Sequence, residues 1–280
     1  MFQKIGFIGL GLIGGSIAKK IHTLYPDVTI IATAGHQETI TEAYGEHLIS
    51  NQNLCEIKDF YDCDYIFLCT PVKRNIEYLR QLKGNIKNGC IITDVGSVKT
   101  DIHEEVTALA MEDCFIGGHP MAGREKSGYD ASQGTLYQNA SMIVTGMPEE
   151  LEARLFAFFH ALGFSRLQKS TPEEHDRIIA YTSQLAHVLS SAYVKSPAAL
   201  THTGFSAGSF RDMTRVAYLN PTMWTELFLD NAEPLCDEID GLCERLKTYS
   251  DAIRNGRREE LFALLKEGRD RKEFLEEREK

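Results

Sequence analysis

A glycine pattern close to the N-terminus constrains the fold more than any other feature of this sequence. The short apolar run "KIGFIG" (4–9) leads directly into Gly9-x-Gly11-x-x-Gly14, and a helix-like stretch follows. In a strand–turn–helix context this spacing is typical of a dinucleotide-binding unit. The first glycine permits the tight turn, the second lets the backbone reach a pyrophosphate, and the third lets the helix pack on the strand. The alternative is a plain turn between strand and helix.

The start of this helix and the end of the second strand complete the expected cofactor site. Leu12 and Ile13 stand at the helix N-terminus, whose dipole favours a phosphate. An acidic residue that binds the ribose 2′-hydroxyl of NAD is expected about 20 residues further on. The chain reads "ATAGHQET" there, with Ala34 near the expected place, so NAD and NADP both remain open. We expect neighbouring cofactor contacts from Thr33 and His36.

Two parts of the chain follow different patterns. Up to about residue 168, short β-branched apolar runs alternate with helical stretches, as in strands covered by helices on both faces of a parallel sheet. We therefore expect an α/β fold, with a Rossmann-type doubly wound sheet in a dinucleotide-binding domain (1–169) and an all-α substrate and dimerisation domain (170–280). The expected strands are 4–9, 28–33, 65–70, 90–95, 114–118 and 141–146.

Helical signals fill the second part. Thr171 as N-cap, Pro172 and Glu174 form a capping box that predicts a helix continuing to about Val194. Pro234 either kinks a later, long helix or marks its first turn. The apolar residues of that helix recur at alternating spacings of three and four, and they form either an internal bundle seam or a homodimer interface. They are Phe228, Ala232, Leu235, Ile239, Leu242, Leu246, Tyr249 and Ile253.

Composition limits the classes of partner. The 280 residues are 43% hydrophobic and 25% charged, with no signal-peptide pattern, which favours a cytoplasmic globular protein. No apolar run approaches the roughly 20 residues of a membrane span. The formal net charge of −10 argues against nucleic acid and anionic membranes as partners, and a small anionic substrate needs a local basic pocket. The seven cysteines form no CxxC pair, so we expect reduced thiols and no metal site.

The loops expected at the carboxyl ends of the strands are the most specific part of the sequence, because ligands of doubly wound sheets bind there. They read "CTPVKR" (69–74), "DVGSVKT" (94–100) and "GGHPMAGREKSG" (117–128). With "GLGLIGGS", "EEHD" and "FRDMTR", these motifs resemble, in order and over nearly the whole chain, the prephenate/arogenate dehydrogenases of tyrosine biosynthesis. The length resembles the form without a chorismate mutase or ACT domain.

This resemblance implies a reaction and a catalytic base. The family oxidises and decarboxylates prephenate to 4-hydroxyphenylpyruvate, or arogenate to tyrosine, with NAD or NADP. His119 matches the family's catalytic histidine, which takes the hydroxyl proton as hydride leaves the same carbon; an ordinary histidine pKa of about 6.5 suits this task. Ser97 matches a serine near the nicotinamide and the substrate hydroxyl, or it is a helix N-cap. Thr70 and Pro71, in "CTPV", join the expected cofactor-binding residues.

The resemblance also implies substrate-binding residues, each with a plainer alternative. Arg215 matches an arginine that binds a substrate carboxylate, or it pairs with Asp212 or a neighbour. His187 faces the active site or is a core residue. Lys99 attracts anions or lies on the surface.

The loop after "HPMAG" supplies two further candidates. Glu125 gates or orients substrate, or it is a solvated acid. Arg124 departs from the small polar residue expected there; it contacts a carboxylate or points outward. A cation at this position disfavours the ammonium of arogenate, and therefore favours prephenate.

Other functions fit parts of the same sequence. Another two-domain hydroxy-acid dehydrogenase shares the glycine loop and a helical second domain but lacks "GGHPMAG". A non-catalytic dinucleotide sensor does not need the intact catalytic loop. The apolar stripe and the family resemblance together predict a homodimer through the C-terminal helices.

Overall fold

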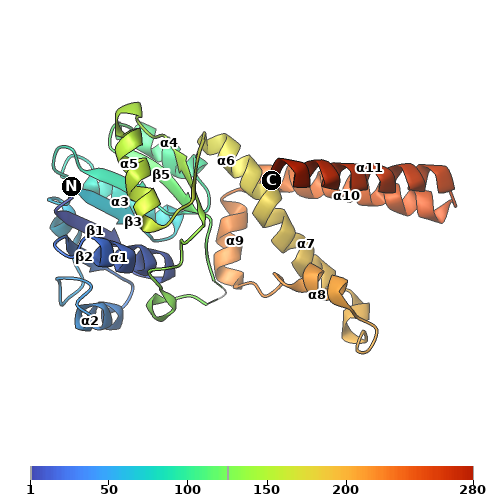
Figure 1. Cartoon of the computed structure of the whole chain (residues 1–280), viewed down its shortest axis with the longest axis horizontal. Helices are drawn as coiled ribbons and strands as arrows, with labels where there is room; N and C mark the ends of the chain where they lie inside the picture. The colour runs from blue at the N-terminus through green and yellow to red at the C-terminus, as the bar shows by residue number, and fades with distance from the viewer. Residues whose placement is uncertain (1, 125, 280) are drawn as a thin grey trace. The chain divides into compact units, whose positions relative to one another are not determined.

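The computed structural model of this protein describes residues 2–124 and 126–279. The chain divides into two compact units, Met1–Ile179 and Ala180–Lys280. The first contains a sheet covered by helices and the second is helical (Figure 1), so the predicted fold class is confirmed. None of the helices in the described ranges combines the length with the apolar character that a bilayer span requires.

A seven-stranded sheet, counted over the described residues, forms the centre of the first unit. Its order is β2-β1-β3-β4-β5-β6-β7, and every pairing from β2 to β5 is parallel. All residues of β3 and β4 are buried, as expected for central strands of a covered parallel sheet. The strands are β1 (Lys4–Ile8), β2 (Thr29–Thr33), β3 (Tyr65–Leu68), β4 (Ile91–Asp94), β5 (Phe115–Pro120), β6 (Ser141–Thr145) and β7 (Arg166–Ser170).

Alternate side chains of the strands enter two separate apolar cores, because successive residues of a strand point to opposite faces. Phe7 and Phe67 stack with ring centroids 5.0 Å apart on the face covered by α1 and α5. Ile8 and Leu68 lie on the other face, with α3 and α4. The elements of this unit outside the sheet, up to α5, are α1 (Leu12–Leu24), α2 (Gln37–Gly45), the 3₁₀ turn η1 (Ile57–Phe60), α3 (Val72–Leu82), α4 (Thr100–Ala108), the 3₁₀ turn η2 (Tyr129–Ala131) and α5 (Glu149–Leu162).

The sheet departs from the prediction at its β5–β7 end. β6 runs antiparallel to β5, whereas the sequence predicts a parallel sheet. The described part of the connecting segment 121–140 contains one helical element, the short turn η2. A parallel β6 would require a long crossover that returns the chain to the other end of the sheet, and this short turn does not form one. The apolar pattern also does not predict β7, because its sequence RLQKS is polar and largely exposed at the sheet edge.

The helix predicted over residues 171–194 is interrupted. It consists of α6 (Pro172–Ile179), a π-helical segment η3 (Ala180–Gln184) and α7 (Leu185–Tyr193). π-helical segments concentrate at functional sites and place an extra residue in one turn. The side chains of α6 therefore do not continue in register along α7.

The start of α6 follows the predicted cap. The Glu174 N–H donates to Thr171 Oγ1 at 3.2 Å, and the Glu174 carboxylate accepts a bond from Ser170 Oγ at 3.3 Å. The predicted domain boundary precedes α6, whereas the division between the compact units follows it, at 179/180. The reason is that Asp176 of α6 is hydrogen bonded to the start of α4.

The second unit has a small core. Ala180, Leu185 and Leu235 are buried, and Val188, Phe228, Ile239 and Leu242 pack against them. α10 and α11 lie side by side (Figure 1). The elements here, after η3 and α7, are the 3₁₀ turn η4 (Pro197–Leu200), α8 (Gly208–Thr214), α9 (Pro221–Leu229), α10 (Ala232–Arg254) and α11 (Arg258–Glu279).

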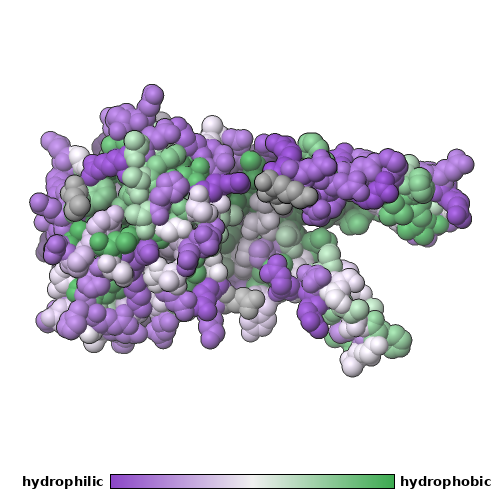
Figure 2. Space-filling view, in the orientation of Figure 1, coloured by the Kyte–Doolittle hydropathy of each residue, from purple (hydrophilic) through white to green (hydrophobic). Residues whose placement is uncertain are grey.

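The predicted apolar stripe is divided between two helices and two environments. Phe228 lies in α9, so the prediction of one continuous helix from this residue is wrong. Pro234 is in the first turn of α10, where a proline disturbs no intrahelical bond. Leu242 packs against the core, but Leu246 and Ile253 are 54% and 63% exposed. Figure 2 accordingly shows hydrophobic surface among the hydrophilic residues of the α10–α11 hairpin.

Candidate functional site

The carboxyl ends of β1, β3, β4 and β5 carry the predicted site segments of the first unit. Because these strands are parallel neighbours, the glycine loop, the Thr70 segment, the Ser97 segment and His119 share one edge of the sheet. This edge is where doubly wound sheets bind their ligands.

The glycine loop has the shape that a dinucleotide requires. Gly9 has φ +102°, and a Cβ there would lie 2.6 Å from the Cys69 carbonyl oxygen. A Cβ on Gly14 would lie 2.4 Å from the Gly9 oxygen, so the third glycine allows α1 to approach β1. A Cβ on Gly11 would meet nothing within 4 Å among the described atoms. Gly11 therefore borders open space beside the helix N-terminus.

The first turn of α1 faces the same space. Gly11 is the N-cap, and as a glycine it has no side chain that could accept the N–H groups of the first turn. Leu12 and Ile13 are the first helical residues, and N–H groups in a first turn have no intrahelical acceptor. These backbone donors can hold a pyrophosphate.

The ends of β2 and β3 provide the other expected cofactor contacts. Thr33 ends β2, and its carbonyl accepts the Gly9 N–H at 3.0 Å. His36 is exposed at the N-cap of α2. Thr70 is held by buried Asn75, whose Oδ1 accepts Thr70 Oγ1 at 2.6 Å, and Pro71 is the N-cap of α3.

Lys99 differs from one of the two predictions made for its charge. It is 1% exposed and its ammonium is paired with the buried Asp94 carboxylate, so the surface alternative is wrong. Asp94 also accepts N–H bonds from Gly96 at 2.8 Å and Gly118 at 3.2 Å. Asp94 thus joins the end of β4 to β5, and Lys99, with its charge matched by Asp94, presents no ammonium to solvent.

Ser97 is not a helix N-cap, so that alternative is wrong. α4 begins at Thr100, and the carboxylate of Asp176 caps it. Asp176 accepts the N–H of Lys99 at 2.8 Å, and both the N–H and the hydroxyl of Thr100 at 2.8 and 2.6 Å. Ser97 lies half-buried in the loop between β4 and α4.

His119 lies within a strand rather than in the predicted loop. β5 extends to Pro120, and His119 pairs with Ile143 of β6. The preceding glycines are required because a Cβ on Gly118 would lie 2.7 Å from the Asp94 oxygen and one on Gly117 2.1 Å from Thr145 Oγ1. A regular strand therefore fixes the backbone of the candidate base.

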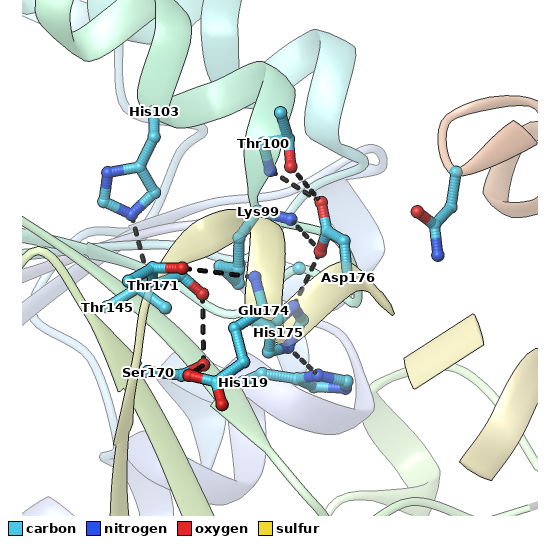
Figure 3. A network of polar contacts seen from close by, with 12 residues as sticks. Lys99, Thr100, His103, His119, Thr145, Ser170, Thr171, Glu174, His175 and Asp176 are labelled. Atoms are coloured by element: carbon cyan, nitrogen blue, oxygen red, sulfur yellow. Dashed lines mark hydrogen bonds and ion pairs between the residues drawn. The ribbon is translucent and has the colours of Figure 1, made fainter. Parts of the chain in front are cut away.

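A chain of hydrogen bonds extends from His119 into α6 (Figure 3). His119 Nδ1 lies 2.9 Å from His175 Nε2, and His175 Nδ1 lies 2.7 Å from Asp176 Oδ1. His175 and Asp176 are each 2% exposed. Two adjacent residues of one helix thus connect the imidazole on β5 to the N-terminus of α4.

The surroundings keep His119 neutral and Asp176 charged. Burial, with smaller contributions from His175 and Lys99, holds the pKa of His119 well below its usual 6.5. The sequence predicted an ordinary histidine pKa, and the difference comes from this burial. Burial alone would raise the pKa of Asp176, but hydrogen bonds from His175 and Thr100 hold it below its usual value.

The remaining candidates are more exposed. His187 on α7 lies 2.8 Å from the Ser183 carbonyl through Nδ1, and its ring packs on Trp224 with centroids 4.0 Å apart. Arg215, the C-cap of α8, is exposed, and the described contacts contain no ion pair with Asp212. Arg124 is exposed in the first unit. Glu125 lies outside the described residues.

Comparisons with known proteins identify the family. The family model "prephenate dehydrogenase, nucleotide-binding domain" matches residues 17–156, and "prephenate dehydrogenase, dimerization domain" matches residues 171–267. A prephenate dehydrogenase of Lactococcus lactis subsp. cremoris is 32% identical over 285 residues, which cover 98% of this chain and 78% of the relative. The chain belongs to the prephenate dehydrogenase family.

Solved structures of this oxidoreductase family have the same fold. A prephenate dehydrogenase from A. aeolicus, in complex with hydroxyphenyl propionate and NAD+, has a TM-score of 0.85 at 27% identity and covers 98% of this chain and 99% of its own. The arogenate dehydrogenase of Synechocystis has a TM-score of 0.82 at 30% identity and covers 97% and 99%. Family members named for either substrate, prephenate or arogenate, therefore resemble this chain in fold.

Sequence reasoning assigned no role to His175 or Asp176. They form part of the motif "EEHD", which contributed to the family resemblance. A histidine and an acid at adjacent positions of a predicted helix are not a chemical signal by themselves. Their contacts with His119 and Lys99 span 56 and 77 residues, and they become visible when α6 packs beside β5 and α4.

Proposed function

We propose that this protein is an NAD(P)-dependent prephenate dehydrogenase that converts prephenate to 4-hydroxyphenylpyruvate and CO2. The observation that carries the proposal is the half-buried imidazole of His119, whose surroundings lower its pKa and favour the neutral form, at the same sheet edge as the glycine loop. Family membership supplies the reaction class, and this edge supplies a base together with a fitting cradle for the cofactor.

His119 is the proposed general base. A neutral imidazole can accept the proton of the ring hydroxyl as that carbon is oxidised, which contributes about 10²–10⁴-fold in rate. Loss of CO2 from the opposite carbon leaves its electron pair in the ring, which becomes a phenolate. His119 then returns the proton to the phenolate oxygen, so the overall step releases no proton.

The residues of the glycine loop are proposed to hold the cofactor. Backbone N–H groups of Leu12 and Ile13 bind the pyrophosphate next to Gly11. Thr33 and His36 border the ribose, and Thr70 with Pro71 borders the ring-proximal part. The nicotinamide, when bound, supplies the hydride acceptor. Neither a carboxylate nor an arginine stands at the ribose position, so NAD and NADP are both proposed.

Substrate contacts are proposed for the residues that match the family motifs. Arg215 binds a substrate carboxylate, for which a bidentate guanidinium is well suited. His187 and Ser97 orient the ring and its hydroxyl, and Glu125 orients substrate or controls its access. Lys99 acts indirectly, by holding Asp94 at the end of β4. Arg124 adds a positive charge that disfavours the ammonium of arogenate, which makes prephenate the preferred substrate.

A homodimer through the helices of the second unit is also proposed. Leu246 and Ile253 on α10, and Phe262 and Leu265 on α11, are each more than half exposed in the single chain. Covering such apolar side chains with a second copy removes them from water. The name of the family model that matches residues 171–267 supports this assignment.

The direct test is an enzymatic assay of the purified protein. Prephenate or arogenate is mixed with NAD+ or NADP+, and reduced nicotinamide is followed by absorbance while the aromatic product is identified by chromatography. We expect prephenate to be oxidised with one of the two cofactors. A protein that oxidises arogenate faster than prephenate would reverse the substrate assignment, and no reduction with either substrate would refute the proposal.

A further inference from the structure

The contacts between β5, α6 and α4 give the candidate base a hydrogen-bond partner at Nδ1. We propose that His175 and Asp176 are positioning residues that hold His119 in the tautomer with its proton on Nδ1 and its lone pair on Nε2. The inference rests on the proposed role of His119 as a base, because that role requires an unprotonated ring nitrogen directed at the substrate.

The carboxylate sets the direction of the hydrogen bonds. Asp176 is ionised, since its hydrogen bonds keep its pKa low, and an ionised carboxylate can only accept. The nitrogen 2.7 Å from Oδ1, His175 Nδ1, must therefore carry a proton. A His175 ring that carries this single proton accepts through Nε2.

The same logic extends to the next ring. The acceptor His175 Nε2 lies 2.9 Å from His119 Nδ1, so His119 donates its proton there. A neutral His119 with a proton on Nδ1 has its lone pair on Nε2. The direction of the hydrogen bond at Asp176 thereby determines, through His175, which nitrogen of His119 can act as a base.

Asp176 is itself well fixed. Its two oxygens accept the N–H of Lys99, the N–H of Thr100 and the hydroxyl of Thr100, in addition to the bond from His175 (Figure 3). The positive end of the α4 dipole favours the charged carboxylate. The backbone of α4 thus holds Asp176 in position, and its negative charge also favours the imidazolium that His119 forms after accepting a proton.

Two substitutions of His175 separate positioning from general structural support. In His175→Gln, the side-chain oxygen reaches approximately the place of Nε2 and can still accept the His119 Nδ1–H. In His175→Asn, the shorter amide can donate to Asp176 but offers His119 no acceptor. Both variants leave the bonds between Asp176 and α4 in place.

We expect different kinetics from the two variants. His175→Gln should keep kcat within about tenfold of the wild type, and His175→Asn should lose about 10²–10⁴-fold in kcat with KM nearly unchanged, as expected for a base in the wrong tautomer. Thr171→Ala is the matched control: it removes the cap of the same helix, should lower the melting temperature, and should leave kcat unchanged. Equal kcat values for the two His175 variants, with both folded, would overturn the proposal.

A spectroscopic measurement tests the tautomer without turnover. In protein labelled with ¹⁵N-histidine, the His119 signals, assigned by comparison with His119→Asn, should report a protonated Nδ1 and an unprotonated Nε2 at neutral pH. Asp176→Asn removes the negative charge that fixes His175 Nδ1 as a donor, and should weaken the preference of His119 for the tautomer protonated on Nδ1. A wild-type His119 that is protonated on Nε2 refutes the positioning role, whatever the enzymatic assay shows. Failure to oxidise either substrate refutes the proposed function, and the NMR measurement still decides which tautomer His119 adopts.

Discussion

The two units differ in how they treat their apolar side chains. In the first, strands and helices enclose two separate cores, and large rings such as Phe7, Phe67 and Phe159 are fully buried. In the second, the core has few buried members, and Phe262, Phe274 and other large apolar side chains are more than half exposed. The first unit contains the core that its own fold requires, whereas the second presents apolar surface that a partner copy would cover.

The site residues follow the same division. His119, His175 and Asp176 are held by hydrogen bonds inside the first unit. Arg215 in the second unit is exposed. We therefore expect changes in the first unit to alter the chemical step or the fold, and changes in the second to alter substrate affinity or assembly.

The largest effect is expected for His119→Asn. It removes the base but keeps an amide N–H that can donate to His175 Nε2. Turnover should fall about 10²–10⁴-fold, while cofactor binding measured by fluorescence and the melting temperature stay near their wild-type values. Near-normal turnover in this variant would show that another group takes the proton.

A smaller loss is expected for Arg215→Ala. KM for the substrate should rise about 10–100-fold, equivalent to about 1.4–2.8 kcal/mol, because one carboxylate loses its charged partner. Arg215→Lys restores the charge without the bidentate geometry and should recover part of the loss. Steady-state kinetics with the cofactor varied provides the control, since an equal loss of cofactor affinity would indicate a structural role for Arg215.

The parts of the fold that local patterns determine could be predicted from the sequence. Alternating apolar runs and helices indicated the α/β sheet, and the spacing of Gly9, Gly11 and Gly14 located the first turn. β7 could not be predicted in this way, because it is an edge strand that pairs with β6 alone and its residues are largely polar. The start of α10 after Asn231 was also missed, since Phe228 continues the apolar spacing across the break between α9 and α10.

The candidate site could be predicted as far as single motifs extend. The motif around His119 gave the base, but its environment depends on side chains from distant elements. Lys99 reads as a surface or anion-binding residue, because a sequence does not reveal that Asp94 will be buried beside it. The orienting pair on α6 was missed because its partners become neighbours through tertiary packing.

Assembly tests the second unit directly. A double substitution, Leu246→Glu with Ile253→Glu, places two charges on the exposed face of α10 and should raise the dimer dissociation constant at least about tenfold, or 1.4 kcal/mol. Analytical ultracentrifugation over a range of concentrations measures this change. Lys247→Glu is a matched control on the same helix, where an exposed polar residue is changed. A monomeric wild-type protein at micromolar concentration would contradict the proposed interface.

Two glycines of the first unit separate folding from cofactor binding. Gly14→Ala places a methyl group 2.4 Å from the Gly9 oxygen and should destabilise the fold by about 1–3 kcal/mol. Gly11→Ala meets no described atom within 4 Å, so stability should change by less than about 1 kcal/mol, while cofactor affinity falls about tenfold. Thermal melting and cofactor titration measure the two effects. Equal destabilisation by both substitutions would remove the argument that the space beside Gly11 is reserved for a ligand.

The smallest expected effect is the pH dependence that the half-buried His119 contributes. Its pKa in the folded protein lies below 6.5, so kcat/KM should remain level through pH 6.5 and fall at lower pH as the imidazole becomes protonated. Between the lowered pKa and about 6.5 the unfolded chain binds the extra proton, so stability decreases as the pH falls, by at most about 1.4 kcal/mol per pH unit for this group. His119→Asn lacks this contribution, and its melting temperature should therefore fall less between pH 7 and pH 5.5 than that of the wild type. A decline of kcat/KM that begins at or above pH 6.5 would mean that burial does not keep His119 neutral. The contrast between the apolar cores of the first unit and the exposed apolar side chains of the second would then not extend to the chemistry of the candidate site.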